Sequence, residues 1–411
     1  MKTLVDSENL RIDSEMRNRN YLPIAEPASR RSTKTLHHKR ISANDENEPY
    51  YELCGPIRCA TVGSQPTEGH SWLRLGLNEY TPQGSYKPET KVSGKDIEQE
   101  LSQLRSANVA LQTKAKMSLI SEGEIFRSAK EDVGSSYILY IAQFIDGIRR
   151  AGDKKEHTGA LSIDGPIKNI DCRVICDDWN KAQQITQLPV KINLPGPITF
   201  ASRIPSPYYK SHEKTARDYA QILGVQLRAL EALGCKWAQI DDPAIIWEQK
   251  KYPYGVDCLN EALSFTNGNM KTIVHMCQGN QYSFSGYKGY EKEKIYYKEV
   301  SAQIAESRVD AVAIEKPNLP GLNEFGLGEF GDKTIFLCLV DVHSTTVESV
   351  SDIADDVIIA LEEVPADNLV ITPDCGIKHF SQHLAASKLQ NMSDAVYLIN
   401  KTFHELTMKT K

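Results

Sequence analysis

The sequence predicts an α/β protein whose main part is a (β/α)8 barrel. From about residue 55 onward, short apolar runs alternate with longer amphipathic segments. The apolar runs are nearly continuous, which is typical of parallel strands that are buried on both faces. Eight strand–helix units spread over roughly 350 residues match the size of such a barrel with insertions.

Each strand is expected where a short apolar run is bounded by polar or turn-forming residues. The expected strands are residues 58–64, 115–124, 188–196, 236–245, 271–277, 310–315, 334–343 and 368–376. The expected helices are residues 97–117, 134–151, 211–234, 256–267, 291–307, 350–363 and 381–406. Residues 158–175 alternate between apolar and polar side chains, so we expect a hairpin inserted between two barrel units there.

Residues 1–52 are expected to form an extended polar arm, partly disordered, ahead of one barrel domain over residues 53–411. The arm is rich in Arg, Ser, Asn and Glu and has little apolar periodicity, so it lacks the surface needed to build a core. Its basic cluster "RRSTKTLHHKR" is compatible with an interaction patch and with a solvated tail.

The composition excludes several classes of protein. Of the 411 residues 25% are charged and 40% apolar, and the net charge of -6 comes from interspersed acids and bases, so we expect no nucleic-acid partner. No apolar run reaches the ~18 residues of a membrane helix, and the N-terminus lacks a secretory signal. Nine scattered cysteines are expected to be mostly reduced. We therefore expect a cytoplasmic protein without a membrane partner, and leave its oligomeric state open, a homodimer being one option.

Reactive side chains recur where the expected strands end. His275 and Cys277 lie two apart in "KTIVHMC", Glu315 ends "DAVAIE", and Cys375 follows the last strand in "TPDCG". Residues two apart on a strand point the same way, and the carboxyl ends of barrel strands meet at one mouth, where active sites lie. We expect these four side chains to become neighbours.

Together, these four side chains form a ligand set suited to Zn²⁺, with two thiolates, one imidazole and one carboxylate. Zinc lowers the pKa of a bound thiol, so the expected chemistry is alkyl transfer to a substrate sulfur that is held as a thiolate. Each residue also has a purely structural interpretation, such as packing for His275 and Cys277 or a salt bridge for Glu315. Their shared location favours the metal site.

Eight short motifs, in this order, resemble the catalytic domain of cobalamin-independent methionine synthase. They are "TVGSQPT" (61–67), "GEIFR" (123–127), "LPGPITF" (194–200), "QIDDPA" (239–244), "HMC" (275–277), "AIE" (313–315), "DVH" (341–343) and "PDCGIK" (373–378). The resemblance is to the short, single-barrel branch, whose relatives include epoxyalkane:coenzyme M transferases. It implies a barrel of the type shared with uroporphyrinogen decarboxylase, and transfer of a methyl group to homocysteine or a similar amino-acid thiol through a zinc-bound thiolate, forming methionine.

The resemblance also implies a role for individual residues. His275, Cys277, Glu315 and Cys375 stand where that family binds zinc. His343, at the end of "VDVH", matches a histidine thought to act as a proton relay, and an imidazole suits proton delivery near pH 7. A buried structural histidine is the alternative for His343.

Three further residues are implied to hold the amino-acid part of the substrate. Glu124 and Asp241 match carboxylates that bind the homocysteine amino group, and a buried ammonium does require hydrogen-bonded anions. Ser64 matches a residue that meets the substrate carboxylate. The structural alternatives are a helix-terminal charge for Glu124 and a turn acid for Asp241, because Asp before Pro is a common turn former.

Two departures from the family pattern bear on the function. Asp241-Asp242-Pro243 stands where the family usually has "DEP". Arg203 is nearest to the position at which folate-using members stack a tryptophan on the pterin, and such stacking supplies much of the recognition of a flat heterocycle. The methyl donor is therefore open. Alternatives are alkyl transfer to another thiol from an epoxide or a corrinoid, and a barrel that binds a thiol without catalysis.

Overall fold

A computed structural model describes residues 55–67, 94–125, 136–150, 161–247, 251–278, 297–315 and 326–409. Eight parallel strands form one sheet in the order β1-β10-β9-β8-β7-β6-β5-β2. Their bounds are β1 (Arg58–Cys59), β2 (Ile120–Ser121), β5 (Val190–Pro195), β6 (Trp237–Asp241), β7 (Lys271–Met276), β8 (Ala311–Glu315), β9 (Thr334–Val340) and β10 (Leu369–Pro373). The predicted arm over residues 1–52 lies outside the described residues, so it stays a prediction.

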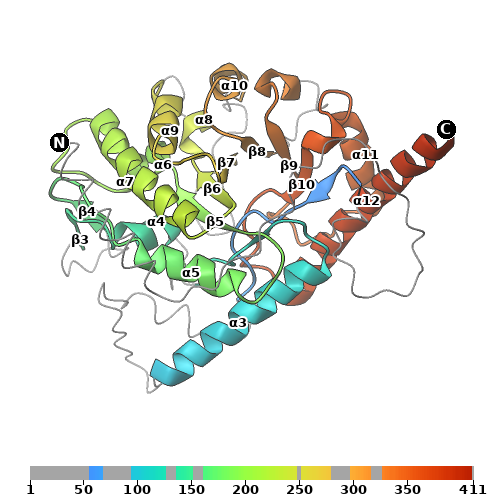
Figure 1. Cartoon of the computed structure of the whole chain (residues 1–411), viewed down its shortest axis with the longest axis horizontal. Coiled ribbons are helices and arrows are strands. Elements are labelled where there is room, and N and C mark those ends of the chain that lie inside the picture. The colour runs from blue at the N-terminus through green and yellow to red at the C-terminus, as the bar shows by residue number, and fades with distance from the viewer. Residues whose placement is uncertain are drawn as a thin grey trace.

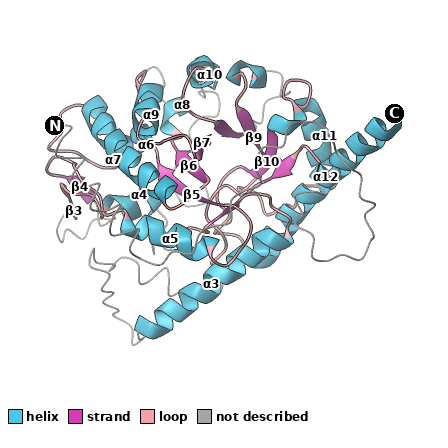
Figure 2. Ribbon diagram, in the orientation of Figure 1, coloured by secondary structure: helices cyan, strands magenta, loops and turns pink. Residues whose placement is uncertain are grey.

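The two edge strands of this sheet meet and close it into a barrel. Ala60 and Leu119 form a parallel bridge just beyond β1 and just before β2. The Thr61 amide donates to the Leu119 carbonyl at 3.3 Å, and the Ser118 amide donates to the Cys59 carbonyl at 2.8 Å. The predicted (β/α)8 fold class is confirmed, and Figure 2 shows the strands enclosed by helices.

Helices surround the strands on the outside (Figure 1). They are α3 (Gly94–Lys114), α4 (Ser136–Ala142), α5 (Arg173–Gln183), α6 (Pro197–Arg203), α7 (His212–Ala232), α8 (Ala244–Trp247), α9 (Gly255–Leu263), α10 (Tyr297–Ala305), α11 (Val350–Ala360) and α12 (Gln382–Lys409), with 3-10 turns at Leu327–Phe330 and Ala366–Asn368. Serine side chains begin two of them: Ser211 accepts from the Lys214 amide and Ser349 from the Asp352 amide, which satisfies a donor that the first helical turn leaves unpaired.

The apolar core has an outer and an inner part. The larger cluster includes alternate strand residues such as Ile192, Ile240 and Val274 and the apolar faces of the helices. A smaller cluster, which contains Ala313 and Phe336, comes from the strand positions in between. Because side chains alternate across a strand, this second set fills the inside of the barrel. The inward positions nearer the strand ends are polar, and they form the candidate site.

The predicted hairpin exists, but its strands are not where we expected them. Strand β3 (Ile148–Arg150) pairs antiparallel with β4 (Leu161–Ile163), so only one strand falls within residues 158–175. The end of that stretch begins helix α5, whose Ile175, Trp179 and Ala182 are buried. These residues recur at helical spacing, and the Trp179 indole donates to the Val190 carbonyl at 2.9 Å. The short-range alternation was therefore misleading, because a helical period begins within it.

Candidate active site

Two thiols meet at the mouth of the barrel. Cys277 directly follows β7 and Cys375 lies two residues after β10, and their side chains are hydrogen-bonded to each other. The bond from Cys277 lowers the pKa of the Cys375 thiol, burial opposes this effect, and the nearby His275 charge adds to the lowering. The net result is a pKa below the usual range, which favours the thiolate that a metal or an electrophile requires.

His275 lies beside these thiols and is held from both ring nitrogens. It is 2% exposed, its Nδ1 lies 2.9 Å from Asp241 Oδ1, and its Nε2 lies 3.1 Å from the Asp374 carbonyl oxygen. Both partners are oxygen atoms, so each ring nitrogen of His275 faces an acceptor in this arrangement. Burial lowers the pKa of His275, but the bond and the charge of Asp241 outweigh it and the pKa is raised. A carboxylate on Nδ1 is the usual way to direct Nε2 toward a metal.

Glu315 and His343 gather with a residue that was not predicted. Within the described ranges, Glu315, His343 and Asp374 are the group of three potential ligands whose atoms all lie within 4.8 Å of one another. Glu315 Oε2 accepts from the Gln278 amide at 2.6 Å, and His343 Nδ1 lies 3.1 Å from Asp341 Oδ1. Glu315 is thus grouped with His343 and Asp374. The four predicted ligands lie at neighbouring strand ends but do not form one shell in this arrangement; they are His275, Cys277, Cys375 and Glu315.

Tyr297 joins the two strand ends that carry most of these residues. Its hydroxyl donates to the Met276 carbonyl at 2.6 Å and accepts from the Glu315 amide at 3.2 Å. The Tyr297 side chain is 4% exposed, and burial raises its pKa well above the usual value, so the hydroxyl keeps the proton that it donates. The ends of β7 and β8 are therefore held at a fixed separation.

The predicted substrate-binding residues border the same mouth. Glu124 Oε1 accepts from Asn193 Nδ2 at 2.9 Å, and both atoms pack so tightly on Gly63 that an added Cβ would lie 2.5 Å from Glu124 Oε1. Ser64 packs on Gly376, where a Cβ would lie 2.1 Å from Ser64 Oγ. Ser64 therefore lies beside the segment that carries Cys375.

The two neighbouring acids at the end of β6 have different surroundings. Asp241 faces inward and contacts His275. Asp242 is fully buried and accepts from the Ile198 amide at 3.1 Å and from the Thr199 amide and hydroxyl, each at 2.7 Å. These are groups at the start of α6, so Asp242 serves as a helix cap supplied by another element. The departure from "DEP" therefore falls on a structural residue.

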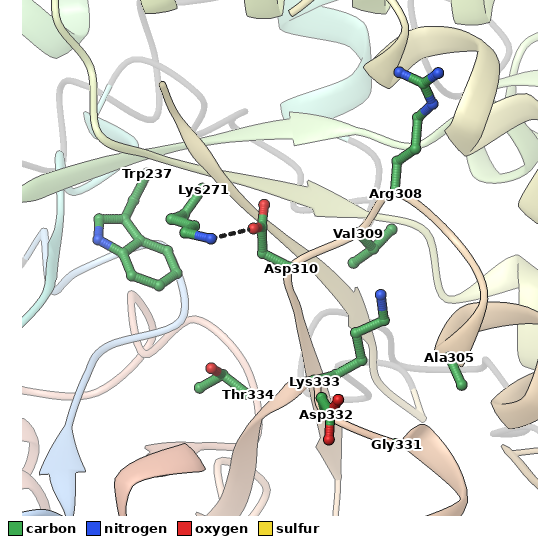
Figure 3. Close-up of a pocket in the computed structure, with 10 residues that line it drawn as sticks. All are labelled: Trp237, Lys271, Ala305, Arg308, Val309, Asp310, Gly331, Asp332, Lys333 and Thr334. Atoms are coloured by element: carbon green, nitrogen blue, oxygen red, sulfur yellow. Dashed lines mark hydrogen bonds and ion pairs between the residues drawn. The ribbon is translucent and has the colours of Figure 1, made fainter. Parts of the chain in front are cut away.

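A separate hollow lies at the opposite end of the barrel (Figure 3). Its volume is about 600 Å³, and its lining includes Trp237, Lys271 and Thr334, which are the first residues of β6, β7 and β9. Lys271 Nζ lies 2.5 Å from Asp310 Oδ1 across it. Because chemistry in barrels belongs to the carboxyl ends of the strands, this hollow is distinct from the candidate site.

Residues 59–397 match the family described as "Cobalamin-independent synthase, Catalytic domain". The chain belongs to this family. The resemblance stated from the eight motifs is thus confirmed. No helix in the described part of the chain is long and apolar enough to cross a membrane.

Two relatives of this chain carry the name methionine synthase. A protein named methionine synthase from Saccharolobus solfataricus is 26% identical over 350 residues, covering 83% of this chain and 94% of that protein. One of the same name from Pyrococcus horikoshii is 30% identical over 232 residues, covering 56% of this chain and 63% of that protein.

Two solved structures of this family share the fold. The first is a B12-independent methionine synthase from Shewanella sp. W3-18-1 in complex with selenomethionine, with a TM-score of 0.70 at 24% identity, covering 85% of this chain and 99% of that one. The second is a putative vitamin-B12 independent methionine synthase from Listeria monocytogenes, with a TM-score of 0.62 at 18% identity, covering 84% of this chain and 98% of that one.

Several polar residues of the site were not predicted from the sequence. Lys191, Asn193 and Gln239 line the barrel interior, and Asp374 joins Glu315 and His343. One signal was present in "LPVKINLPG", where a lysine and an asparagine interrupt a run expected to be buried on both faces. Polar residues in such a strand must find partners inside the protein. Asp374 carried no comparable signal, because an acid after a strand usually lies at the surface.

Proposed function

We propose that this protein is a zinc-dependent S-methyltransferase that acts on homocysteine or a similar amino-acid thiol and forms methionine or its analogue. The observation that carries the proposal is the contact of Cys277 with Cys375 beside His275. The family membership and the relatives named methionine synthase support the same reaction class.

The donor set at the mouth fits zinc. His275, Cys277 and Cys375 would hold the ion, with Glu315 from the neighbouring strand end, and two sulfurs with one imidazole favour Zn²⁺ over hard cations. When bound, the ion would keep a substrate sulfur deprotonated at neutral pH while leaving it nucleophilic. Two features of the site favour metal binding: the pKa of Cys375 is lowered, and Asp241 fixes the orientation of the His275 ring.

Recognition of the amino-acid part would fall to residues around the thiol pair. Glu124 and Asp241 supply two carboxylates for an ammonium group, and Ser64, packed beside Gly376, supplies a hydroxyl for the substrate carboxylate. Two acids at the mouth favour an amino-acid thiol over a thiol that carries a sulfonate, because the acids would repel a second anion.

His343 would move the proton that the donor needs. Asp341 Oδ1 lies 3.1 Å from its Nδ1, which orients the ring and makes Nε2 the nitrogen that exchanges a proton. The His343 side chain is 22% exposed, so the proton can be resupplied from solvent. Protonation of the leaving group near pH 7 suits an imidazole.

A second candidate keeps the thiol and changes the donor. Arg203 ends α6, is exposed, and stands where folate-using members have a tryptophan. The Arg203 charge lowers the pKa of Tyr137, whereas Asp241 and Cys277 raise it, which supports a place for Arg203 near the same site. A panel of methyltetrahydrofolate, methylcobalamin and a short epoxide separates the options, and we expect transfer from at least one donor that is not a folate.

The proposal is tested by comparing Cys375→Ser with wild type and with Cys172→Ser. Cys172 is buried at the start of α5 and is not one of the proposed ligands, so it controls for loss of a buried thiol. We expect about one zinc per chain in wild type and in Cys172→Ser, and loss of both zinc and methyl transfer in Cys375→Ser with an unchanged circular dichroism spectrum. Normal turnover by Cys375→Ser would refute the proposed mechanism.

A reducing compartment such as the cytoplasm suits this function. All eight cysteines of the described residues are free, and Cys277 and Cys375 are in contact. Two adjacent thiols would be prone to oxidation in a secreted protein, which would remove the proposed metal ligands.

A further inference from the structure

A lysine is buried inside the barrel, one layer below the candidate site. Lys191 of β5 is completely inaccessible to solvent. Its ammonium nitrogen donates to the Val62 carbonyl, to Asn193 Oδ1 at 2.9 Å and to Gln239 Oε1 at 2.7 Å. Burying an ammonium is costly unless it is hydrogen-bonded, and an apolar side chain would fill this position more simply. A lysine here therefore calls for a reason beyond packing.

Lys191 determines how the side-chain amides of Asn193 and Gln239 are oriented. An ammonium has only donors, so the side-chain oxygens of Asn193 and Gln239 must face it and their NH₂ groups must point away. Asn193 Nδ2 donates to Glu124 Oε1 at 2.9 Å. Gln239 Nε2 donates to Asp241 Oδ1 at 2.6 Å. One buried cation thereby turns both amides into donors aimed at the two carboxylates of the mouth.

We propose that Lys191 is a positioning residue which, through Asn193 and Gln239, orients Glu124 and Asp241 to receive the amino group of the thiol substrate. The inference rests on the proposed function, in which those two acids bind that amino group. Each amide bond fixes one oxygen of its carboxylate, so the direction of the second oxygen is set before substrate arrives. Preorganisation of this kind removes an ordering cost from binding.

Replacing the lysine removes the constraint on the amides. In Lys191→Met the two oxygens no longer face a donor, so either amide can rotate and present its oxygen to a carboxylate, which repels it. The bond to Glu124 would then be lost, and Asp241 would keep only the contact of its Oδ1 with His275. The binding of a ligand's amino group would therefore weaken more than the binding of its sulfur. This makes the role separable from a general effect on the fold.

The test is calorimetric titration of the zinc-loaded protein with two thiols, L-homocysteine and 4-sulfanylbutanoate, which lacks the amino group. No methyl donor is required. We expect wild type to bind homocysteine more tightly, and Lys191→Met to lose about tenfold or more of that preference, the weight of a charge-assisted hydrogen bond. The affinity for 4-sulfanylbutanoate should stay unchanged, whereas a merely structural role would weaken both ligands together.

Gln226→Met is a control for the loss of a buried polar side chain, because Gln226 is 1% exposed and lies on α7, outside the barrel strands. It should retain the wild-type preference. Asn193→Leu is a second probe, since it removes the bond to Glu124 while Lys191 keeps the Val62 carbonyl and Gln239 as acceptors. It too should reduce the preference.

The outcomes separate the two proposals. A wild-type preference that survives in both Lys191→Met and Asn193→Leu would overturn the role of Lys191 alone. Equal affinity of wild-type protein for the two thiols would overturn amino-group recognition, and with it the proposed function on which this role depends.

Discussion

Single residues at the mouth take their roles from the side of the strand on which they lie. Asp241 and Asp242 are adjacent, yet one contacts His275 inside the barrel and the other caps α6 outside it. The same alternation brings His275 and Cys277 to one side, because residues two apart share a face of a strand. The position of a residue along its strand therefore decides whether its side chain enters the site or packs outside the barrel.

His343 offers a prediction at this scale. Replacing it with Gln should lower kcat by about 100-fold to 10,000-fold, the range typical of losing a general acid, while thiol affinity and zinc content stay close to wild type. Steady-state kinetics and metal analysis check both parts. His383→Gln, at an exposed position of α12, is the control and should be neutral. Loss of zinc from His343→Gln would mean that His343 acts as a ligand together with Glu315 and Asp374.

Helix α6 shows how an element can depend on a residue outside it. The helix has seven residues, and two of its first N–H groups are satisfied by the Asp242 carboxylate, which follows β6. Gly196 makes room for this contact, since a Cβ there would lie 2.1 Å from Asp242 Cβ. The turn before Arg203 is thereby tied to the strand end that carries Asp241.

The Asp242 carboxyl predicts a pH dependence of stability. Burial raises its pKa from the ordinary 3.8 to about 6, against the lowering effect of the Thr199 bonds. The folded protein therefore binds this proton more tightly than the unfolded chain does, so this contribution to stability is present at low pH and is lost as the pH rises through 6. Metal-free wild type should gain about 1 kcal/mol of unfolding free energy relative to Asp242→Asn between pH 7 and pH 5.

Urea titrations of the two metal-free proteins at pH 7 and pH 5 measure this difference. A constant difference between them at both pH values would show that Asp242 does not titrate in this range, and would contradict the assigned burial of its charge.

At the scale of the whole molecule, α12 connects closure of the barrel to its mouth. The Asn400 side chain bonds the Ile57 amide at 3.2 Å and the Ile57 carbonyl at 2.9 Å, just before the two-residue strand β1. Near the start of the same helix, Lys388 bonds the Asp341 carbonyl at 3.0 Å. Helix α12 therefore holds both the segment before β1, where the sheet closes, and the loop that carries His343.

Asn400→Leu should accordingly destabilise the whole barrel. It leaves two buried backbone groups of Ile57 without these bonds, which costs about 2–4 kcal/mol of unfolding free energy. Chemical denaturation measures this loss. Thr402→Ala, at an exposed position of the same helix, is the control and should lower the unfolding free energy far less. Equal stability of Asn400→Leu and wild type would mean that β1 is held by the sheet alone.

Much of the fold was predictable from local patterns. The apolar runs around Ile192, Val274 and Ile371 mark strands, because a strand buried on both faces needs continuous apolar residues. The hairpin was misplaced and α5 was missed, since a short alternating stretch carries little information about the period that follows it. Boundaries of short elements such as α4 and β1 depend on contacts with distant segments.

The site was predictable only in part, for a related reason. The reactive residues at strand ends, from His275 to Cys375, could be found because barrel geometry gathers strand ends. Asp374, Tyr297 and Gln239 could not be found, because their roles rest on hydrogen bonds to particular atoms of other strands.

By itself, the sequence determined the barrel and the strand ends at which thiols, imidazoles and acids appear, because periodicity and turn chemistry are local properties of the chain. Only the tertiary structure decided that Lys191 is buried beneath the two carboxylates, that Asp242 caps a helix, and that Glu315 lies beside His343. Those facts depend on which groups arrive from elsewhere in the chain, since a buried polar atom takes its role from its partners.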